Sequence, residues 1–459
     1  MVDMEVNIVI SRDTIKPAAD RSLLHAHQKP CNLCIFDQLI PATYVPVIFF
    51  YSIVDPNFNV PKTLVHLKTS LSHTLTHYYP FSGRIKNNLY IHDFDAGVPY
   101  LEARVECRMF ELLELREIEL LNRFIPFHPF RKETESPDQL PLMAFQVSVF
   151  ACGGISVGIS LSHKIFDMET ANTFFKSWAS VFRRDHKAAI TSNPNICQAS
   201  STFPASDNLP QKYLAFMESM WFEEKKYVTR RFAFDAKAIN TLREKAKSDL
   251  VPNPTRVETL TCFLWKHATF ASRHGGTSRR ASVIAQAMNL RRRLKPPMPD
   301  DSIGNLFWWA TAVYNPTDEA ETTYKLCDLL KLLHESLNGL EHDQFLDTLC
   351  GEEGRRVFFE YLDQLLEGMD SLDPTPEIYA FTSWVNILDE VDFGWGKPFW
   401  IGVMGKVGPA FRNLTVFVKT QRGNGIEAWV TMDEKQMSIM EKDPQFLAFA
   451  SPNPRILHV

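Results

Sequence analysis

The segment 184–212 divides this chain into two parts, and that division limits the folds the chain can adopt. It is polar, rich in proline and serine, and lacks the apolar periodicity of a helix or a strand. On both sides of it, strand-like runs are mixed with amphipathic helical runs, a pattern typical of α+β domains. With 459 residues, the chain is long enough for two hydrophobic cores. We therefore predict an N-terminal domain over residues 1–183, a crossover linker over 184–212 and a C-terminal domain over 213–459.

Apolar periodicity and the content of β-branched and aromatic residues predict the individual elements. In the N-terminal part we predict strands at 6–10, 44–53, 142–150 and 155–161, helices at 62–78 and 167–182, a glycine-containing hairpin turn at 152–154 and a turn at 79–84. In the C-terminal part we predict strands at 228–234, 283–289, 305–313, 413–419 and 426–431, helices at 236–247 and 256–265, and helical pieces over 322–369 broken near Asn338 and Gly351.

His163 is the first candidate for chemistry, because it lies directly after the buried strand predicted at 155–161. An imidazole titrates near neutral pH and is the natural general base there. Asp167, four residues on, opens the next helix, where aspartate is a favoured N-cap. Its carboxylate could orient His163, or it could turn away and pair with an arginine; we favour the second, with Arg291 as the partner. We discount Ser162 as a nucleophile, because adjacent strand residues point to opposite faces.

A second distinctive run extends from Asp392 to Gly396 and contains no obvious catalyst. Gly394 and Gly396 permit backbone angles that other residues rarely adopt. Phe393 and Trp395 can pack, and the Asp392 carboxylate can accept an arginine. We interpret the run as structural.

Taken together, these runs resemble the plant BAHD acyltransferases, and within them the alkaloid O-acetyltransferases such as vinorine synthase and salutaridinol acetyltransferase. The resemblance extends along the chain, with further matches at 79–84, 289–291, 304–305, 382–384 and 425–429. It implies two chloramphenicol-acetyltransferase-like domains of mixed sheet and helices with a channel between them. It also implies acetyl-CoA as a co-substrate, with no cofactor held permanently.

The resemblance also implies roles for individual residues. His163 would take the proton of the acceptor hydroxyl in a ternary complex, and the acyl group would pass directly to the acceptor. Asp167 and Arg291 would hold the motif, and Thr382 and Trp384 would face the oxyanion and the acceptor. Gly304 and Asn305 would contact the cofactor.

The loop after Trp384 departs from the family pattern. It is one residue shorter before Asp392, and Asn386 stands where arginine is common. These differences leave the placement of Thr382 and Trp384 open.

Three consecutive aromatic residues, Phe307, Trp308 and Trp309, lie in the strand predicted at 305–313. Because side chains alternate along a strand, at least one must face the core. The others could line an apolar acceptor pocket, as a polycyclic substrate would require.

Composition and charge exclude several classes of protein. The net charge of −5 does not favour nucleic acid or an anionic membrane, and no apolar run is long enough to span a bilayer. Eight scattered cysteines and the lack of a signal-peptide pattern favour a reducing, cytoplasmic location. Cys31 and Cys34, preceded by His25 and His27, suggest zinc only remotely, because no second close-spaced ligand pair follows. We expect no metal, and a monomer.

The favoured function is transfer of acetyl from acetyl-CoA to a hydroxyl of a plant alkaloid, preferably of the monoterpene indole type. A hydroxycinnamoyl, other aromatic or malonyl transferase acting on a phenolic or terpenoid alcohol remains an alternative. A catalytically silent member that binds a ligand or a partner is an alternative of another class. The sequence does not name the acceptor alcohol.

Overall fold

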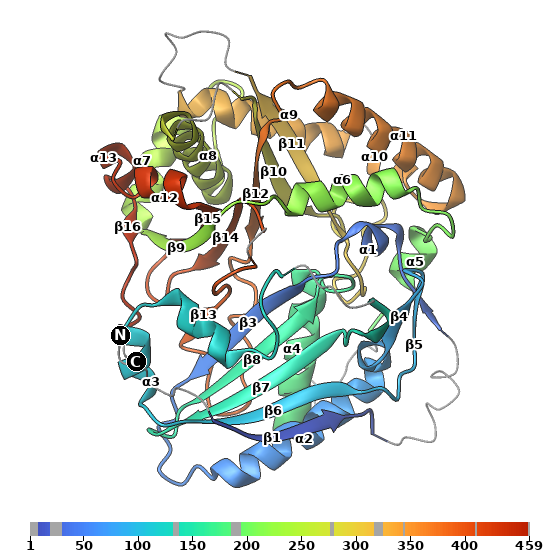
Figure 1. Ribbon diagram of the computed structural model, residues 1–459, viewed down its shortest axis with the longest axis vertical. Coiled ribbons are helices and arrows are strands. Elements are labelled where there is room, and N and C mark those ends of the chain that lie inside the picture. Colours follow the sequence, from blue (N-terminus) through green and yellow to red (C-terminus); the bar gives the residue numbers. More distant parts are fainter. Residues whose placement is uncertain are drawn as a thin grey trace.

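Two mixed β-sheets organise the protein, one in each half of the molecule (Figure 1). The computed structural model describes residues 8–18, 30–131, 137–184, 194–275, 280–315, 325–342, 345–408 and 411–457. The first sheet has the order β1 (Ile8–Ile15), β6 (Val98–Val105), β7 (Met143–Phe150), β8 (Ile155–Ser162), β3 (Tyr44–Tyr51) and β13 (Trp400–Gly402). The second has the order β11 (Phe307–Tyr314), β10 (Ser282–Asn289), β12 (Glu377–Ser383), β14 (Leu414–Lys419), β15 (Ile426–Asp433), β9 (Tyr227–Phe234) and β16 (Ser451–Pro452). A small third sheet joins β2 (Cys31–Asn32), β5 (Tyr90–His92) and β4 (Arg84–Lys86).

Helices cover the sheets and connect the halves (Figure 1). In the first part of the chain they are α1 (Ile35–Leu39), α2 (Val60–His77), α3 (Met109–Glu114), α4 (Met168–Arg183), α5 (Gln198–Thr202) and α6 (Gln211–Trp221). In the rest they are α7 (Ala236–Ala246), α8 (Arg256–His274), α9 (Leu326–His342), α10 (Phe345–Thr348), α11 (Gly351–Asp370), α12 (Glu434–Met440) and α13 (Pro444–Leu447). Short 3-10 helices lie at Tyr79–Ser82, Ile118–Phe124 and Pro137–Gln139.

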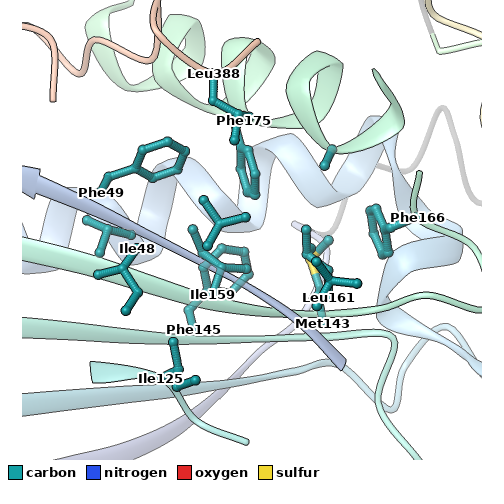
Figure 2. Packing of buried hydrophobic residues seen from close by; sticks show 14 of the residues in the cluster. Ile48, Phe49, Ile125, Met143, Phe145, Ile159, Leu161, Phe166, Phe175 and Leu388 are labelled. Carbon is teal, nitrogen blue, oxygen red and sulfur yellow. The ribbon is translucent and has the colours of Figure 1, made fainter. Parts of the chain in front are cut away.

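The core of the first half lies between its sheet and helices α2 and α4. Every residue of β3 and β8 is buried, because both faces of these strands are covered. Phe49 of β3 meets Phe175 of α4 edge to face, with ring centroids 5.3 Å apart. Figure 2 shows these side chains in one cluster with Leu388, which comes from the second half of the chain. On the other face, a Cβ added at Gly158 would lie 1.6 Å from the carbonyl oxygen of Phe124, so only glycine fits.

Most predicted elements are present, with ends that move by a few residues. The hairpin β7–β8 forms around the predicted glycine turn. Within the described residues β1 begins at Ile8 and continues to Ile15, beyond the predicted end at residue 10; residues 6 and 7 lie outside the described part. The predicted break near Asn338 is wrong, because α9 continues to His342 and packs through buried leucines such as Leu330 and Leu333. The segment 79–84 begins as a 3-10 helix.

One strand crosses the predicted domain division. β13 pairs antiparallel with β3, so Trp400–Gly402 belongs to the sheet of the N-terminal half. The predicted linker also contains α5 and the start of α6, while its residues 185–193 lie outside the described part of the chain. The domain boundaries stay predictions. The pairing of β13 with β3 shows that the C-terminal half of the chain contributes a strand to the sheet of the N-terminal half.

Candidate active site

His163 lies directly after the end of β8. Its backbone N–H donates to the carbonyl of Thr43 at 2.9 Å, which continues the pairing of β8 with β3 by one residue. The next residue, Lys164, points the other way and donates to the carbonyls of Gln38 and Ile40. The imidazole therefore extends from a rigid strand end.

Asn305 fixes the tautomer of His163. Its Nδ2 donates to the carboxylate of Asp37 at 2.9 Å and to the carbonyl of His163 at 2.8 Å. Its Oδ1 must then be the atom that faces Nδ1 of His163 at 3.2 Å, and it can only accept a hydrogen bond. Nδ1 therefore carries the proton, and Nε2 keeps the lone pair that a general base needs.

Asp37 is the anchor of this chain of hydrogen bonds. Its carboxylate also accepts from the backbone N–H of Asn305 at 2.7 Å and of Cys34 at 2.9 Å. Burial raises the pKa of Asp37, although these hydrogen bonds oppose the rise. The ammonium of Lys164 interacts electrostatically with Asp37, and burial lowers the pKa of Lys164 to about 7.

Burial also lowers the pKa of His163 from its ordinary value of 6.5. The hydrogen bond that His163 donates to Asn305 and the charge of Asp167 oppose that shift without reversing it. Near neutral pH the imidazole is therefore unprotonated, as a general base must be before it accepts a proton.

Asp167 turns away from His163, in the arrangement that we favoured from the sequence. Its carboxylate accepts two hydrogen bonds from Arg291, at 2.6 and 3.1 Å, and Arg291 is fully buried. It also caps α4 through the N–H of Thr170 at 2.8 Å and accepts from the N–H of Leu306 at 3.0 Å. Through these contacts Asp167 ties the loop that carries Asn305 to the start of α4.

Gly304 and Asn305, which we expected to contact the cofactor, are occupied by the protein itself. The Asn305 side chain is fully buried between His163 and Asp37. Gly304 has a φ of +127°, and its carbonyl accepts from Arg291 and Thr170. Both residues are thus buried in contacts within the protein, and their contact with coenzyme A stays a prediction.

A cavity opens on His163 and encloses about 850 Å³ that protein atoms do not fill, part of it continuous with solvent. Both halves contribute to the lining, which includes Val45, Phe130, Trp221, Met288, Phe307, Trp309, Thr382, Trp384, Ile387 and Leu414. Phe307 and Trp309 face the cavity while Trp308 is core, so the predicted alternation is confirmed.

Thr382 and Trp384 both line this cavity with His163. Thr382 lies near the end of β12, and the backbone N–H of Trp384 donates to the carbonyl of Phe417 at 2.8 Å. The shorter loop that follows contains two residues in the left-handed region, Asn386 at φ 65° and Leu388 at φ 73°. Despite these left-handed residues, the loop leaves Thr382 and Trp384 in the lining of the cavity.

A second, more polar cavity of about 950 Å³ adjoins the first and shares Trp384 and Ile387 with it. Two lysines line it, each in an ion pair: Lys397 with Glu390 at 2.6 Å and Lys419 with Asp389 at 3.5 Å. His163 is thus reached from an apolar cavity that borders a polar one.

The run from Asp392 to Gly396 packs against the first half and lines neither cavity. Phe393 meets Trp178 of α4 at 4.9 Å, and Trp395 meets Tyr51 of β3 at 5.8 Å. The Asp392 carboxylate accepts from the N–H groups of Gly394 and Gly396, which have φ of 99° and 105°, and Arg183 donates to the Asp392 carbonyl.

The family follows from comparison with known proteins. Residues 4–447 match the model of the Transferase family. The chain belongs to this family, the BAHD acyltransferases. It is 35% identical over 452 residues to akuammiline synthase 2 of Alstonia scholaris, covering 98% of this chain and 97% of that protein. It is 35% identical over 469 residues to a limonoid 7-O-acetyltransferase of Citrus sinensis, covering 97% and 98%.

The solved structure of vinorine synthase is similar over the whole chain. Its TM-score is 0.77 at 29% identity, and 97% of this chain and 98% of that chain are covered. The predicted family and the predicted fold of two chloramphenicol-acetyltransferase-like halves are confirmed. This BAHD protein is an acyl-CoA-dependent acyltransferase.

Two important residues of this BAHD chain escaped sequence reasoning. Trp221, at the end of α6, packs on the His163 ring at 5.1 Å, and no local pattern distinguishes it from a core tryptophan. Asp37 sits in an apolar run after Cys34, and a lone carboxylate in such a run was a signal of a buried polar contact.

The remaining expectations concern metals and membranes. His25 and His27 lie outside the described residues, and within the described part no group of three or more His, Cys, Asp or Glu side chains is placed to hold a metal ion. None of the described helices combines the length and apolarity needed to cross a membrane.

Proposed function

We propose that this chain transfers acetyl from acetyl-CoA to a hydroxyl of a polycyclic plant metabolite, an alkaloid being favoured, with His163 as the general base. The observation that carries the proposal is the unprotonated Nε2 of His163, which Asn305 and Asp37 impose and which belongs to a residue lining the apolar cavity. The acetyl group is favoured because the limonoid relative is named an acetyltransferase.

The reaction needs only groups that this site brings together. As the acceptor oxygen attacks the thioester carbonyl, its proton moves to Nε2 of His163. The tetrahedral intermediate collapses, the carbon–sulfur bond breaks, and His163 returns the proton to the departing thiolate. Hydrogen-bond donors at Thr382 and Trp384 would stabilise the negative charge on the carbonyl oxygen.

The two adjoining cavities could each hold one substrate, the acceptor in one and coenzyme A in the other. The apolar cavity suits a polycyclic alcohol. The polar cavity borders the apolar one at Trp384 and Ile387, so a coenzyme A arm held there would bring its thioester to His163. On this arrangement donor and acceptor approach the base from different cavities.

The test is release of free thiol from acetyl-CoA in the presence of hydroxylated polycyclic acceptors. The His163→Ala variant should lose about 10²- to 10⁴-fold in rate, the usual contribution of a general base. His274→Ala, an exposed histidine on α8, is the matched control and should keep full activity. Activity only with malonyl- or aromatic acyl-CoA would overturn the donor, and turnover that survives His163→Ala would overturn the base.

A further inference from the structure

The apolar cavity at His163, which we assign to the acceptor, has an uneven distribution of charge. Its lining contains two carboxylates, Asp167 and Glu169, and no lysine or arginine among the described residues. Asp167 is neutralised by the buried guanidinium of Arg291. Beneath His163, the carboxylate of Asp37 likewise has the ammonium of Lys164 near it. Among the residues that the structure describes, Glu169 is therefore the carboxylate lining this cavity that has no ion pair.

The surroundings of Glu169 leave its carboxylate available to a ligand. It lies in the first turn of α4 and is partly exposed. Its hydrogen bond is a long one, from Nδ2 of Asn172 to Oε1 at 3.4 Å. Arg292 lies close enough to interact with it electrostatically, but pairs with Asp300 at 2.6 Å on the exposed surface.

Aromatic rings form the wall of the same cavity. The ring centroids of Trp221 and Phe307 lie 5.1 and 5.7 Å from that of His163. Trp309 completes the group, 5.4 Å from Phe307 and 6.4 Å from Trp221. The faces of such rings attract cations, most strongly those of tryptophan.

We propose that Glu169 makes this cavity selective for acceptor alcohols that carry a protonated or quaternary amine. A cation that leaves water for an apolar cavity needs an opposite charge, and Glu169 supplies it while the tryptophan rings solvate the rest of the ion. A neutral terpenoid alcohol of the same shape would displace water from the carboxylate without supplying a counter-charge, so the same residue disfavours it. The inference names the acceptor class for the proposed acetyl transfer and rests on that function.

A purely structural role makes a different prediction. An acidic residue in the first turn of a helix stabilises the helix dipole whatever the ligand. In that case Glu169→Gln would lower the melting temperature slightly and change the binding of charged and neutral acceptors equally. The two explanations are separated by the charge of the ligand, not by the size of the effect.

Binding without acetyl-CoA tests the inference independently of turnover, because Trp221 and Trp309 line the cavity and their fluorescence reports occupancy. Three acceptors with one skeleton are compared: a polycyclic tertiary-amine alcohol, its N-methyl quaternary salt and the lactam in which the nitrogen is not basic. We expect wild type to bind both cations about tenfold more tightly than the lactam, and Glu169→Gln to remove that preference. Glu169→Asp should retain it, as should Glu360→Gln, which removes an exposed carboxylate on α11.

Equal binding of amine and lactam by wild type would overturn the inference, as would an equal change for all three ligands in Glu169→Gln. Failure of the proposed function shows separately, as an absence of thiol release from acetyl-CoA with acceptors that do bind. A Glu169→Gln protein that does not fold shifts the decision to Glu169→Asp: loss of cation preference there would also count against the inference.

Discussion

Two buried aspartates lie close to His163, and they differ in what holds them. Asp167 belongs to the visible motif and is bonded to the cationic Arg291. Asp37 lies outside any motif, and its carboxylate accepts hydrogen bonds from the backbone N–H groups of Cys34 and Asn305 and from the Asn305 side-chain amide. Asp167 therefore fixes the loop, whereas Asp37 is connected to His163 through Asn305. The spacing of a motif shows where a site is, but the hydrogen bonds show which carboxylate orients the histidine.

The largest expected effect is on stability, at Asp167. Asp167→Ala leaves the guanidinium of Arg291 buried without its partner, which should cost about 3–5 kcal/mol in the free energy of unfolding. Urea denaturation followed by fluorescence measures the loss. Asp300→Ala, which breaks the exposed pair with Arg292, is the matched control and should cost under about 1 kcal/mol. Similar losses in the two variants would remove the structural role that we assign to Asp167.

The next effect is on catalysis, at Asn305. Asn305→Ala removes the acceptor for Nδ1–H, so the imidazole loses its fixed tautomer and orientation. We expect kcat to fall by about 10²-fold with little change in KM, because a misplaced base slows the proton transfer rather than binding. Steady-state kinetics of the folded variant decides this. A change confined to KM would instead place Asn305 in substrate binding, as its sequence resemblance suggested.

The dependence of kcat/KM on pH tests how the surroundings of His163, including Asn305, set its pKa. Because burial lowers the pKa of His163 from 6.5, kcat/KM should rise with pH through a midpoint below that value and be level near neutrality. The hydrogen bond with Asn305 raises this pKa, so Asn305→Ala should move the midpoint to still lower pH. A midpoint above 6.5 in wild type would show that the base is more solvated or more negatively surrounded than in this structure.

The smallest effect is expected at a third aspartate, Asp392. Asp392→Ala removes two hydrogen bonds from the N–H groups of Gly394 and Gly396 in a partly exposed turn. The cost in the free energy of unfolding should be about 1–2 kcal/mol, with kcat/KM for acetyl transfer unchanged. A loss of activity in a stably folded variant would contradict a structural role for this run.

Sequence reasoning succeeded where the signal was local. The strand that ends before His163, the glycine turn between β7 and β8, and the alternation of Phe307, Trp308 and Trp309 all follow from neighbouring residues. The pairing of Asp167 with Arg291 was favoured because the strand-to-helix turn separates Asp167 from His163.

Sequence reasoning failed where a feature depends on residues far apart in the chain. β13 has three residues and forms because β3 offers an edge some 350 positions away in the chain, which no local pattern can show. The sequence also did not single out Glu169, because the cavity that it borders is built from segments far apart in the chain.

The pairing of β13 with β3 has a consequence for attempts to separate the two halves. An N-terminal fragment that ends in the crossover segment would lack β13, so β3 would become an edge strand with unpaired N–H and C=O groups. The sequence of β3, YVPVIFFY, is almost entirely apolar and carries no charge to discourage association. Such a fragment should aggregate rather than fold, and exchange of whole halves between related enzymes would need to carry residues 400–402 along with the N-terminal partner.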